Sequence, residues 1–221
     1  MIDLKENELI NIKLNTLYKK FTPDFLEEWE KAFEKEAPPR INEFGVIDTE
    51  KYDADSGVLF IGKETNGWDF SGGCLFRKWL EDITKDGFAK GSYVKKHPQI
   101  WYNVGRWSAL MKYPDISVGE LASLKGEVLP AIGNIAFTNI NKVYGYKQSK
   151  DGYYRMASSG VAGEVLRQEI EIIKPKTVVC CGTGEIFLRH VKNHSGKVIF
   201  MPHPSARTNT EEMLAELKKQ L

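Results

Sequence analysis

The sequence has few cysteines, almost no net charge and no long apolar run, and each shortage excludes a class of protein. Three cysteines, two of them adjacent at Cys180 and Cys181, cannot supply a disulfide framework or the four spaced ligands of an iron–sulfur cluster. With 31 Lys and Arg against 30 Asp and Glu, no global field attracts the chain to nucleic acid or to an anionic membrane. No apolar run is long enough to span a bilayer. We therefore expect a cytoplasmic protein in which any polyanion-binding site is local.

The composition is that of an ordinary globular protein. The chain has 221 residues, of which 42% are hydrophobic and 28% charged, so it can bury one sizeable core. We expect a single domain over residues 1–221, with residues 1–50 forming a helical N-terminal extension packed on it. Within that extension, Thr22-Pro23 is a pattern that opens helices, and Pro38-Pro39 is one that ends them.

Four short apolar runs predict buried strands. They are Val58–Ile61, Ile135–Phe137, Thr177–Cys180 and Val198–Met201. Continuous rather than alternating apolarity is typical of parallel strands that are covered on both faces. Amphipathic stretches between the runs, clearest over Gly160–Lys174, are long enough to cross back over a sheet. The sequence therefore predicts an α/β fold: one doubly wound domain with a parallel sheet flanked by helices.

Ligands of open α/β sheets bind beyond the carboxyl ends of the strands, so the residues after each run matter most. These exits carry Glu64, Asn139 and His203, a carboxylate, an amide and an imidazole. Each residue also has a structural interpretation. Glu64 is equally a solvated loop acid, Asn139 a turn cap and His203 a structural histidine, although its flanking prolines would hold the imidazole stiffly.

Glycines at two of the exits indicate tight turns. Gly62 follows the first run, and Gly182-Thr183-Gly184 follows the third. The second pattern lacks the lysine of a phosphate-binding loop and the full dinucleotide fingerprint. We interpret Gly62, Gly182 and Thr183 as forming a backbone turn or a phosphate contact.

In sequence order, four segments resemble the motifs of the uracil-DNA glycosylase superfamily. The segments are Gly57–Glu64, Phe137–Asn139, Pro175–Gly182 and Met201–Ser205, the last with the histidine-proline-serine pattern Met201-Pro202-His203-Pro204-Ser205. The resemblance covers residues 57 to 205. It implies a four-stranded parallel sheet of order 2-1-3-4 and hydrolysis of the N-glycosidic bond of a base flipped out of DNA.

The resemblance also implies a role for each matching residue. Glu64 would position water or stabilise positive charge on the sugar, Asn139 would bond to the edge of the base, and His203 would stabilise negative charge on the departing base. An aromatic residue after the first motif should stack on the base, and Trp68 and Phe70 are both candidates.

The DNA contacts expected from the sequence are local. Ser205 belongs to the last motif. Many proteins of this superfamily carry, shortly after that motif, an apolar residue that inserts into the DNA duplex. Arg207 stands near that position here, so we expect it either to take the place of the apolar residue or to contact phosphate. The segment 142–155 adds Lys142, Lys147, Lys150 and Arg155 among several tyrosines, a composition that suits a DNA groove. The alternative is a solvated loop whose tyrosines pack back on the domain.

Our leading hypothesis is a monofunctional DNA glycosylase that acts as a monomer on single- or double-stranded DNA containing a damaged or modified base. We expect it to need no cofactor and no metal, and to have no membrane partner. Lys63 is the only lysine beside the expected site, and it is not convincingly placed to form a Schiff base. One alternative is a non-catalytic member of the same fold that binds nucleic acid or a nucleotide. Another is a hydrolase of free nucleosides or nucleotides.

Overall fold

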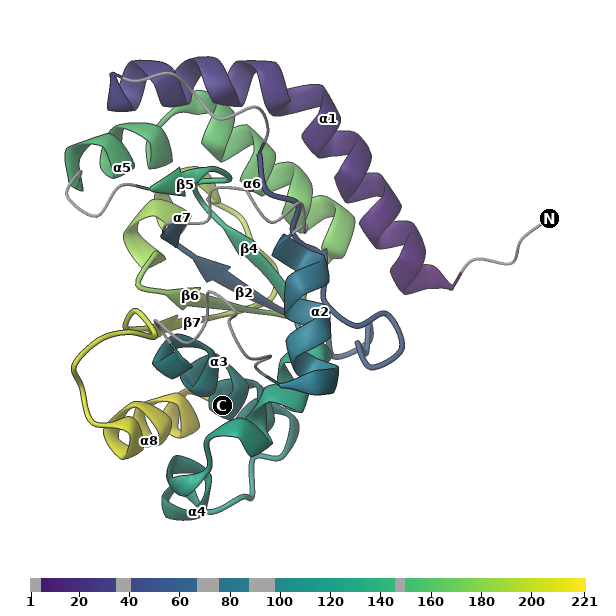
Figure 1. Ribbon diagram of the computed structural model, residues 1–221, viewed down its shortest axis with the longest axis vertical. Helices are drawn as coiled ribbons and strands as arrows, with labels where there is room; N and C mark the ends of the chain where they lie inside the picture. Colours follow the sequence, from purple (N-terminus) through teal and green to yellow (C-terminus); the bar gives the residue numbers. More distant parts are fainter. Residues whose placement is uncertain (1–4, 35–40, 67–75, 88–97, 146–149) are drawn as a thin grey trace.

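A computed structural model describes residues 5–34, 41–66, 76–87, 98–145 and 150–221. A five-stranded, mostly parallel sheet lies at the centre, with helices on both of its faces (Figure 1). Its strands, in order across the sheet, are β1 (Gly45–Val46), β4 (Ala136–Asn139), β2 (Val58–Gly62), β6 (Thr177–Cys181) and β7 (Lys197–Met201). The predicted α/β class is confirmed.

The parallel strands form where the sequence has its continuous apolar runs. Leu59, Phe60 and Ile61 of β2 are fully buried, because β2 lies between β4 and β6 and is covered on both faces. β7 is different: it pairs with β6 alone, and Phe200 is 45% exposed. Apolar residues on both faces therefore mark the interior strands most clearly.

The expectation of a four-stranded sheet in the order 2-1-3-4 does not describe the whole sheet, because β1 is a fifth strand. β1 runs antiparallel to β4, with Gly45 opposite Phe137 and Val46 opposite Ala136. Two residues carry no periodic signal, so this strand exists only through its pairing. Residues 1–50 thus contribute a strand to the sheet as well as a helix.

The helix of that region is longer than the sequence predicted. α1 (Glu6–Phe33) contains Pro23 in its interior, so the expected start at Thr22-Pro23 is wrong. Pro23 has no N–H to donate, and the Thr22 hydroxyl instead donates to the Tyr18 carbonyl at 2.6 Å. Burial of Leu14 and Leu17 before the proline, and of Phe25 after it, stabilises a continuous helix.

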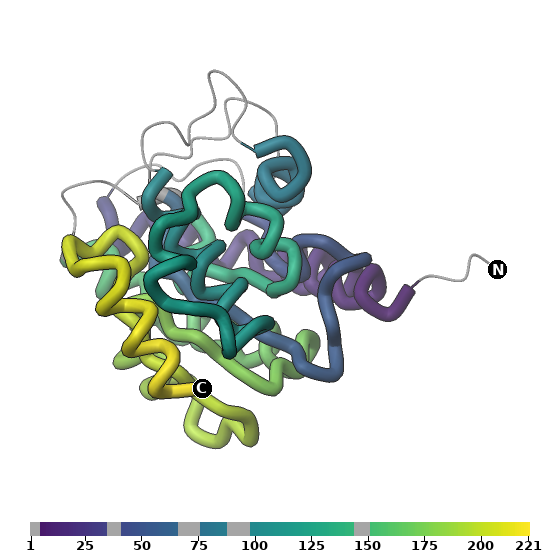
Figure 2. Tube along the Cα trace, turned by 90° about the horizontal axis from the view of Figure 1, so that it is seen from below, coloured from purple at the N-terminus to yellow at the C-terminus, as the bar shows by residue number. Residues whose placement is uncertain are grey.

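The remaining elements complete two helical layers. They are α2 (Phe76–Asp86), α3 (Pro98–Lys112), α4 (Val118–Ser123), the 3-10 helix η2 (Gly126–Asn134), α5 (Lys150–Ala157), α6 (Gly160–Ile173), α7 (Gly184–His190) and α8 (Thr210–Gln220). α1, α5 and α6 pack together on one side, while α8 packs against α3, α4 and β7 on the other (Figures 1 and 2). Within the described residues, no helix is both long and apolar enough to cross a membrane.

A second, two-stranded sheet extends from the carboxyl ends of the main sheet. β3 (Thr65–Asn66) follows β2 and pairs in parallel with β5 (Tyr144–Gly145), which follows β4. The chain segments that leave β2 and β4 therefore stay side by side beyond the main sheet.

Candidate active site

A cavity of about 250 Å³ opens at the carboxyl ends of the parallel strands. Its lining comes from β2 and the residues after it (Gly62, Lys63, Glu64, Thr65), β4 (Phe137, Asn139), β6 (Cys181), the loop after β7 (His203, Pro204, Ser205), α2 (Phe76, Trp79) and α3 (Ile100, Trp101, Val104). This is the edge at which open α/β sheets bind their ligands. The strand ends therefore bring together side chains that are up to about 140 residues apart in the sequence.

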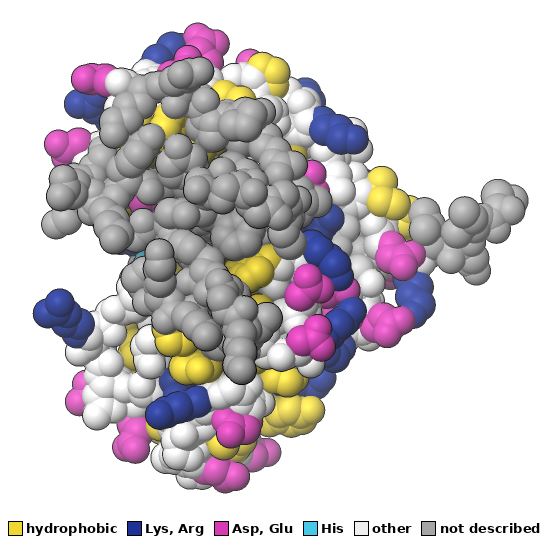
Figure 3. All heavy atoms as spheres, viewed as in Figure 1, with side chains coloured by type: hydrophobic (Ala, Val, Ile, Leu, Met, Phe, Trp, Pro, Cys, Tyr) yellow, Lys and Arg dark blue, Asp and Glu magenta, His cyan; other side chains and the backbone are white. Residues whose placement is uncertain are grey.

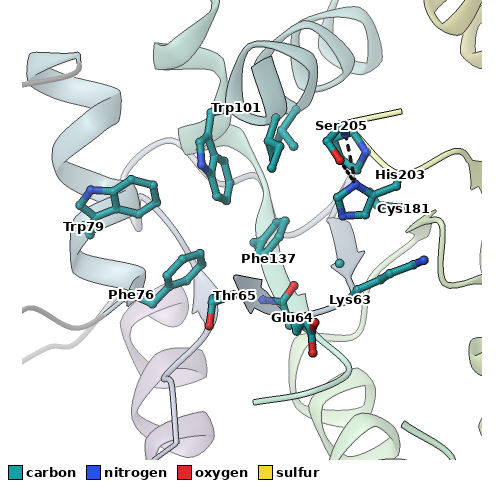
Figure 4. A pocket seen from close by; sticks show the side chains of 15 residues that line it. Lys63, Glu64, Thr65, Phe76, Trp79, Trp101, Phe137, Cys181, His203 and Ser205 are labelled. Atoms are coloured by element: carbon teal, nitrogen blue, oxygen red, sulfur yellow. Dashed lines mark hydrogen bonds between the residues drawn. The ribbon is translucent and has the colours of Figure 1, made fainter. Parts of the chain in front are cut away.

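Aromatic rings form one wall of the cavity. The Trp79 and Trp101 rings meet edge to face with centroids 5.4 Å apart, and Trp101 lies 5.6 Å from Phe137. Phe76 lies 5.4 Å from Trp79. Figure 4 shows these four rings on one side, with Lys63, His203 and Ser205 on the other. A planar, partly apolar ligand such as a nucleobase suits such a wall, because aromatic faces favour stacking.

Asn139 ends β4 with its side chain in the cavity. It is opposite Gly62 in the parallel register, and a Cβ added to Gly62 would lie 2.3 Å from Asn139 Oδ1. The absence of a side chain at Gly62 thus leaves room for this amide. Within the described part of the chain, no hydrogen bond occupies the Asn139 side-chain amide, which leaves its donor and acceptor available to a ligand.

Glu64 is a largely buried carboxyl group whose one hydrogen-bond partner among the described residues is neutral. Asn141 Nδ2 donates to Glu64 Oε2 at 3.2 Å. Burial raises the pKa of Glu64 to about 7, although the Asn141 hydrogen bond and the charge of Lys63 oppose that increase. A carboxyl group that titrates near neutral pH is suited to accept a proton from water during a reaction.

His203 is held as a neutral imidazole with a defined tautomer. The Ser205 backbone N–H donates to His203 Nδ1 at 3.2 Å, and Ser205 Oγ lies 2.6 Å from the same nitrogen. Because Nδ1 accepts, the ring proton of the neutral form is on Nε2. Burial, followed by the charge of Lys63, lowers the pKa of His203 to about 4. At neutral pH, His203 therefore has an N–H donor and no charge.

The loop that carries His203 is held from two directions. Gly182, with φ of +71°, approaches so closely that an added Cβ would lie 3.1 Å from His203 N. From α3, the buried Asn103 donates to the Pro204 carbonyl at 2.7 Å, and Arg106 fixes the Asn103 amide by donating to its Oδ1 at 3.0 Å. The imidazole is thus oriented by rigid surroundings.

Five of the residues predicted from the sequence line the same cavity. They are Gly62, Glu64, Asn139, His203 and Ser205. Gly182, which is exposed, and Thr183, which is buried, do not belong to the cavity lining. Thr183 donates through Oγ1 to the Ile61 carbonyl at 2.8 Å, so its hydroxyl serves the backbone turn.

The predicted stacking residues Trp68 and Phe70, and the predicted DNA-contact residue Lys147, lie outside the described residues. Lys150 is the first residue of α5. Arg155, on the same helix, is exposed and lies 3.5 Å from the Glu34 carboxylate. Arg207 is exposed in the loop before α8. Neither arginine belongs to the cavity lining.

Lys142 corrects the predicted DNA-binding segment. Its side chain is fully buried, 2.7 Å from Glu169 of α6, and it also donates to Thr138 Oγ1 at 2.6 Å. Tyr18 of α1 donates to the same Glu169 at 2.5 Å. The prediction that Lys142 contacts DNA is therefore wrong. A basic segment suggests exposed charge, and only the folded chain reveals a partner 27 residues away.

Most of the aromatic wall is not predictable from the sequence. Phe76 and Trp79 carry no signal of a site, Trp101 lies in an aromatic helical segment typical of a core, and Phe137 belongs to the second motif but has no assigned role. Asn141 stands at the second strand exit but has no role assigned from the sequence. The alternation Asn139-Ile140-Asn141 at a strand end offered a signal for it, because residues two apart in an extended segment face the same side.

Within the described ranges, no group of three or more His, Cys, Asp or Glu side chains is placed to hold a metal ion. The chain matches no protein-family model, and a search of curated proteins finds no match.

Proposed function

We propose that this protein is a DNA glycosylase-like hydrolase that cleaves the N-glycosidic bond of a damaged or modified base, such as uracil, flipped out of DNA. One observation carries the proposal. Glu64, Asn139 and His203, from three different strand exits, line a single cavity that has an aromatic wall. Enzymes that act on a flipped base need such a pocket, in which the base is stacked and its edge is hydrogen-bonded.

The geometry suits a hydrolytic reaction. The ionised Glu64 carboxylate would stabilise positive charge on the deoxyribose and accept a proton from the attacking water. The water oxygen would bond to C1′, while the electron pair of the breaking C–N bond leaves with the base. His203 would stabilise that negative charge by donating a hydrogen bond from Nε2–H. Because the pKa of His203 is about 4, the imidazole would act as a neutral donor. Asn139 would bond to the edge of the base.

The arrangement of the parallel strands supports the proposal. β4, β2, β6 and β7 are neighbours in that order, and every pair among them is parallel. When the antiparallel edge strand β1 is set aside, this succession agrees with the order 2-1-3-4 that the resemblance implies.

A second candidate is hydrolysis of free nucleosides. Two residues of the expected DNA-contact segment, Lys142 and Tyr153, are buried. On the face drawn in Figure 3, the described acidic and basic side chains are interspersed. Burial of Lys142 favours a small substrate, since binding of DNA depends on clustered positive charge and this charge is withdrawn from the expected DNA contact.

The test is a strand-scission assay at low salt. The substrates are single- and double-stranded oligonucleotides that carry uracil, hypoxanthine, xanthine or 5-hydroxymethyluracil, with alkali to reveal abasic sites. Free deoxyuridine and deoxyinosine, followed by chromatography, test the second candidate. Cleavage at one base identifies the enzyme and its substrate together. No base release from any substrate would contradict the proposal.

Matched variants separate catalysis from contamination. Glu64→Gln and His203→Ala should each lower the rate of base release by about 100-fold or more, because each removes a group that acts on the reacting atoms. Glu120→Gln changes an exposed carboxylate on α4 outside the cavity lining and should leave the rate unchanged. Equal rates in all three variants would assign the activity to another protein.

A further inference from the structure

Asn141 is a buried residue behind the cavity that has no part in the roles assigned above. Its side chain is fully buried and makes two hydrogen bonds. Oδ1 accepts from the Val143 backbone N–H at 3.0 Å, and Nδ2 donates to Glu64 Oε2 at 3.2 Å. Because the backbone N–H occupies the amide oxygen, the amide can present only its N–H groups to Glu64.

The main chain fixes the distance between the two residues. Ile140 N donates to the Gly62 carbonyl at 3.0 Å, and Asn141 N donates to the Lys63 carbonyl at 2.9 Å. Further along, β3 and β5 continue this parallel pairing. Asn141 and Glu64 therefore face each other between two paired stretches of backbone, so their contact does not depend on a flexible loop.

The other ionisable groups around Glu64 do not replace this contact. Among the described residues these groups are Lys63 beside it in the chain, Tyr153 of α5 and His203 across the cavity. Lys63 Nζ lies 5.8 Å from the centroid of the Tyr153 ring, and Figure 4 shows the Lys63 side chain extending away from the aromatic wall. Within the described residues, Glu64 has no ion pair, and Asn141 is its one hydrogen-bond partner.

We propose that Asn141 is a positioning residue, whose amide fixes the orientation of the Glu64 carboxylate and stabilises its ionised form through a charge-assisted hydrogen bond. This inference deepens the proposed function and rests on it for the catalytic consequence. In support, the Asn141 hydrogen bond opposes the rise that burial causes in the pKa of Glu64. A donor aimed at a carboxylate stabilises the charged form over the neutral acid.

The experiment compares two buried amides that differ in their contact with Glu64. Asn141→Ala removes the donor to Glu64. Asn42→Ala is the matched control, because Asn42 is also buried and its Nδ2 donates to Thr65 Oγ1 at 2.9 Å, next to Glu64 but not to it. The Glu64 carboxyl is titrated by ¹³C NMR in each full-length protein, with the resonance assigned through Glu64→Gln.

We expect the titration midpoint of Glu64 to rise by about one pH unit in Asn141→Ala and to stay unchanged in Asn42→Ala. Asn141→Asp is a second variant that keeps the oxygen accepting from Val143, and it should raise the midpoint further than Asn141→Ala, because it removes the N–H donor and also places a like charge beside Glu64. An unchanged midpoint in the Asn141 variants, or an equal rise in Asn42→Ala, would overturn the inference.

The titration needs no catalytic activity, so it separates the two proposals. If the wild-type protein releases no base, the proposed function fails while the titration still decides whether Asn141 controls Glu64. If the wild-type protein does release a base, the acidic part of the pH–rate profile should shift in the Asn141 variants by as much as the titration midpoint of Glu64. The value of kcat should also fall in these variants, while KM is retained. An acidic part that stays in place while the midpoint moves would overturn the catalytic role of Asn141.

Discussion

Glu64 and Glu169 are both withdrawn from solvent, but they lie on opposite sides of β4. Phe137 and Asn139 point into the cavity that holds Glu64, whereas Thr138 between them donates to Glu169 at 2.8 Å on the face covered by α1 and α6. Glu169 is ion-paired with Lys142 and also accepts from Tyr18. In the part of the chain that the structure describes, Glu64 has the neutral amide of Asn141 as its one hydrogen-bond partner instead.

Glu169 is a buried charge whose burial is compensated, whereas the burial of Glu64 is largely uncompensated. On the Glu169 side, hydrogen bonds and an opposite charge compensate for the loss of water, and the result is a fixed connection between α1, α6 and β4. On the Glu64 side, the cost of burial remains, and it appears as a pKa raised to about 7. Perturbed and uncompensated titratable groups in a cleft are typical of functional sites.

The largest expected effect comes from removing Lys142, the counter-charge of the buried Glu169. Lys142→Met should lower the free energy of unfolding by about 3–5 kcal/mol, because it leaves Glu169 buried without its counter-charge. Urea unfolding monitored by circular dichroism measures the change. The double variant Lys142→Met/Glu169→Met should recover most of the loss, and a loss below about 1 kcal/mol in the single variant would show that the pair is not a buried ion pair.

The next largest effect is the dependence of the free energy of unfolding on pH that Glu64 causes. The folded protein binds the Glu64 proton more tightly than the unfolded chain, since its pKa is about 7 instead of 4.5. Stability due to this group is therefore present below pH 4.5 and is lost as pH rises to about 7. Glu64→Gln should remove this loss, which makes the variant more stable than the wild type by up to about 3 kcal/mol at pH 8.

Urea unfolding of both proteins at pH 5 and pH 8 measures this difference. Glu120→Gln serves as the control, because it alters an exposed carboxylate of α4. If wild type and Glu64→Gln lose the same stability between the two pH values, Glu64 is not an uncompensated buried acid.

The smallest effect sharpens the comparison across β4. Thr138→Val removes one hydroxyl from the Lys142–Glu169 cluster and leaves the ion pair in place. We expect a loss of about 1–2 kcal/mol in the free energy of unfolding. The titration of Glu64, followed by ¹³C NMR, should not move, because Thr138 faces away from the cavity. A shifted Glu64 midpoint would mean that the two sides of β4 are coupled.

The sequence predicts those features whose signal is local. The interior strands were visible as continuous apolar runs, and the polar residues after them are what the cavity brings together. β1 was invisible because a two-residue strand is defined by its partner. Pro23 suggested a helix start because a proline disfavours a helix interior, but burial on both sides of it outweighs that local cost.

The site was harder to predict where it depends on contacts between distant segments. Lys142 stands in a basic, tyrosine-rich segment, so nothing near it indicates that it is buried against Glu169. The aromatic wall is assembled from α2, α3 and β4, and its residues share no spacing that distinguishes them from core residues such as Trp107. Local patterns therefore identified the polar groups, and only the packing of helices on the sheet identified the apolar surroundings.

The central claim is that Glu64 and His203 form the reactive centre of a base-releasing hydrolase, and the rate of base release against pH tests it most directly. Measurements run from about pH 5 to about pH 9 on the oligonucleotide or nucleoside that the wild type cleaves. The rate should rise with pH, with a midpoint near 7 as Glu64 ionises, and stay flat above it, since His203 is already neutral. A rate that is flat or falling over this range, or no base release from any substrate, would contradict the claim.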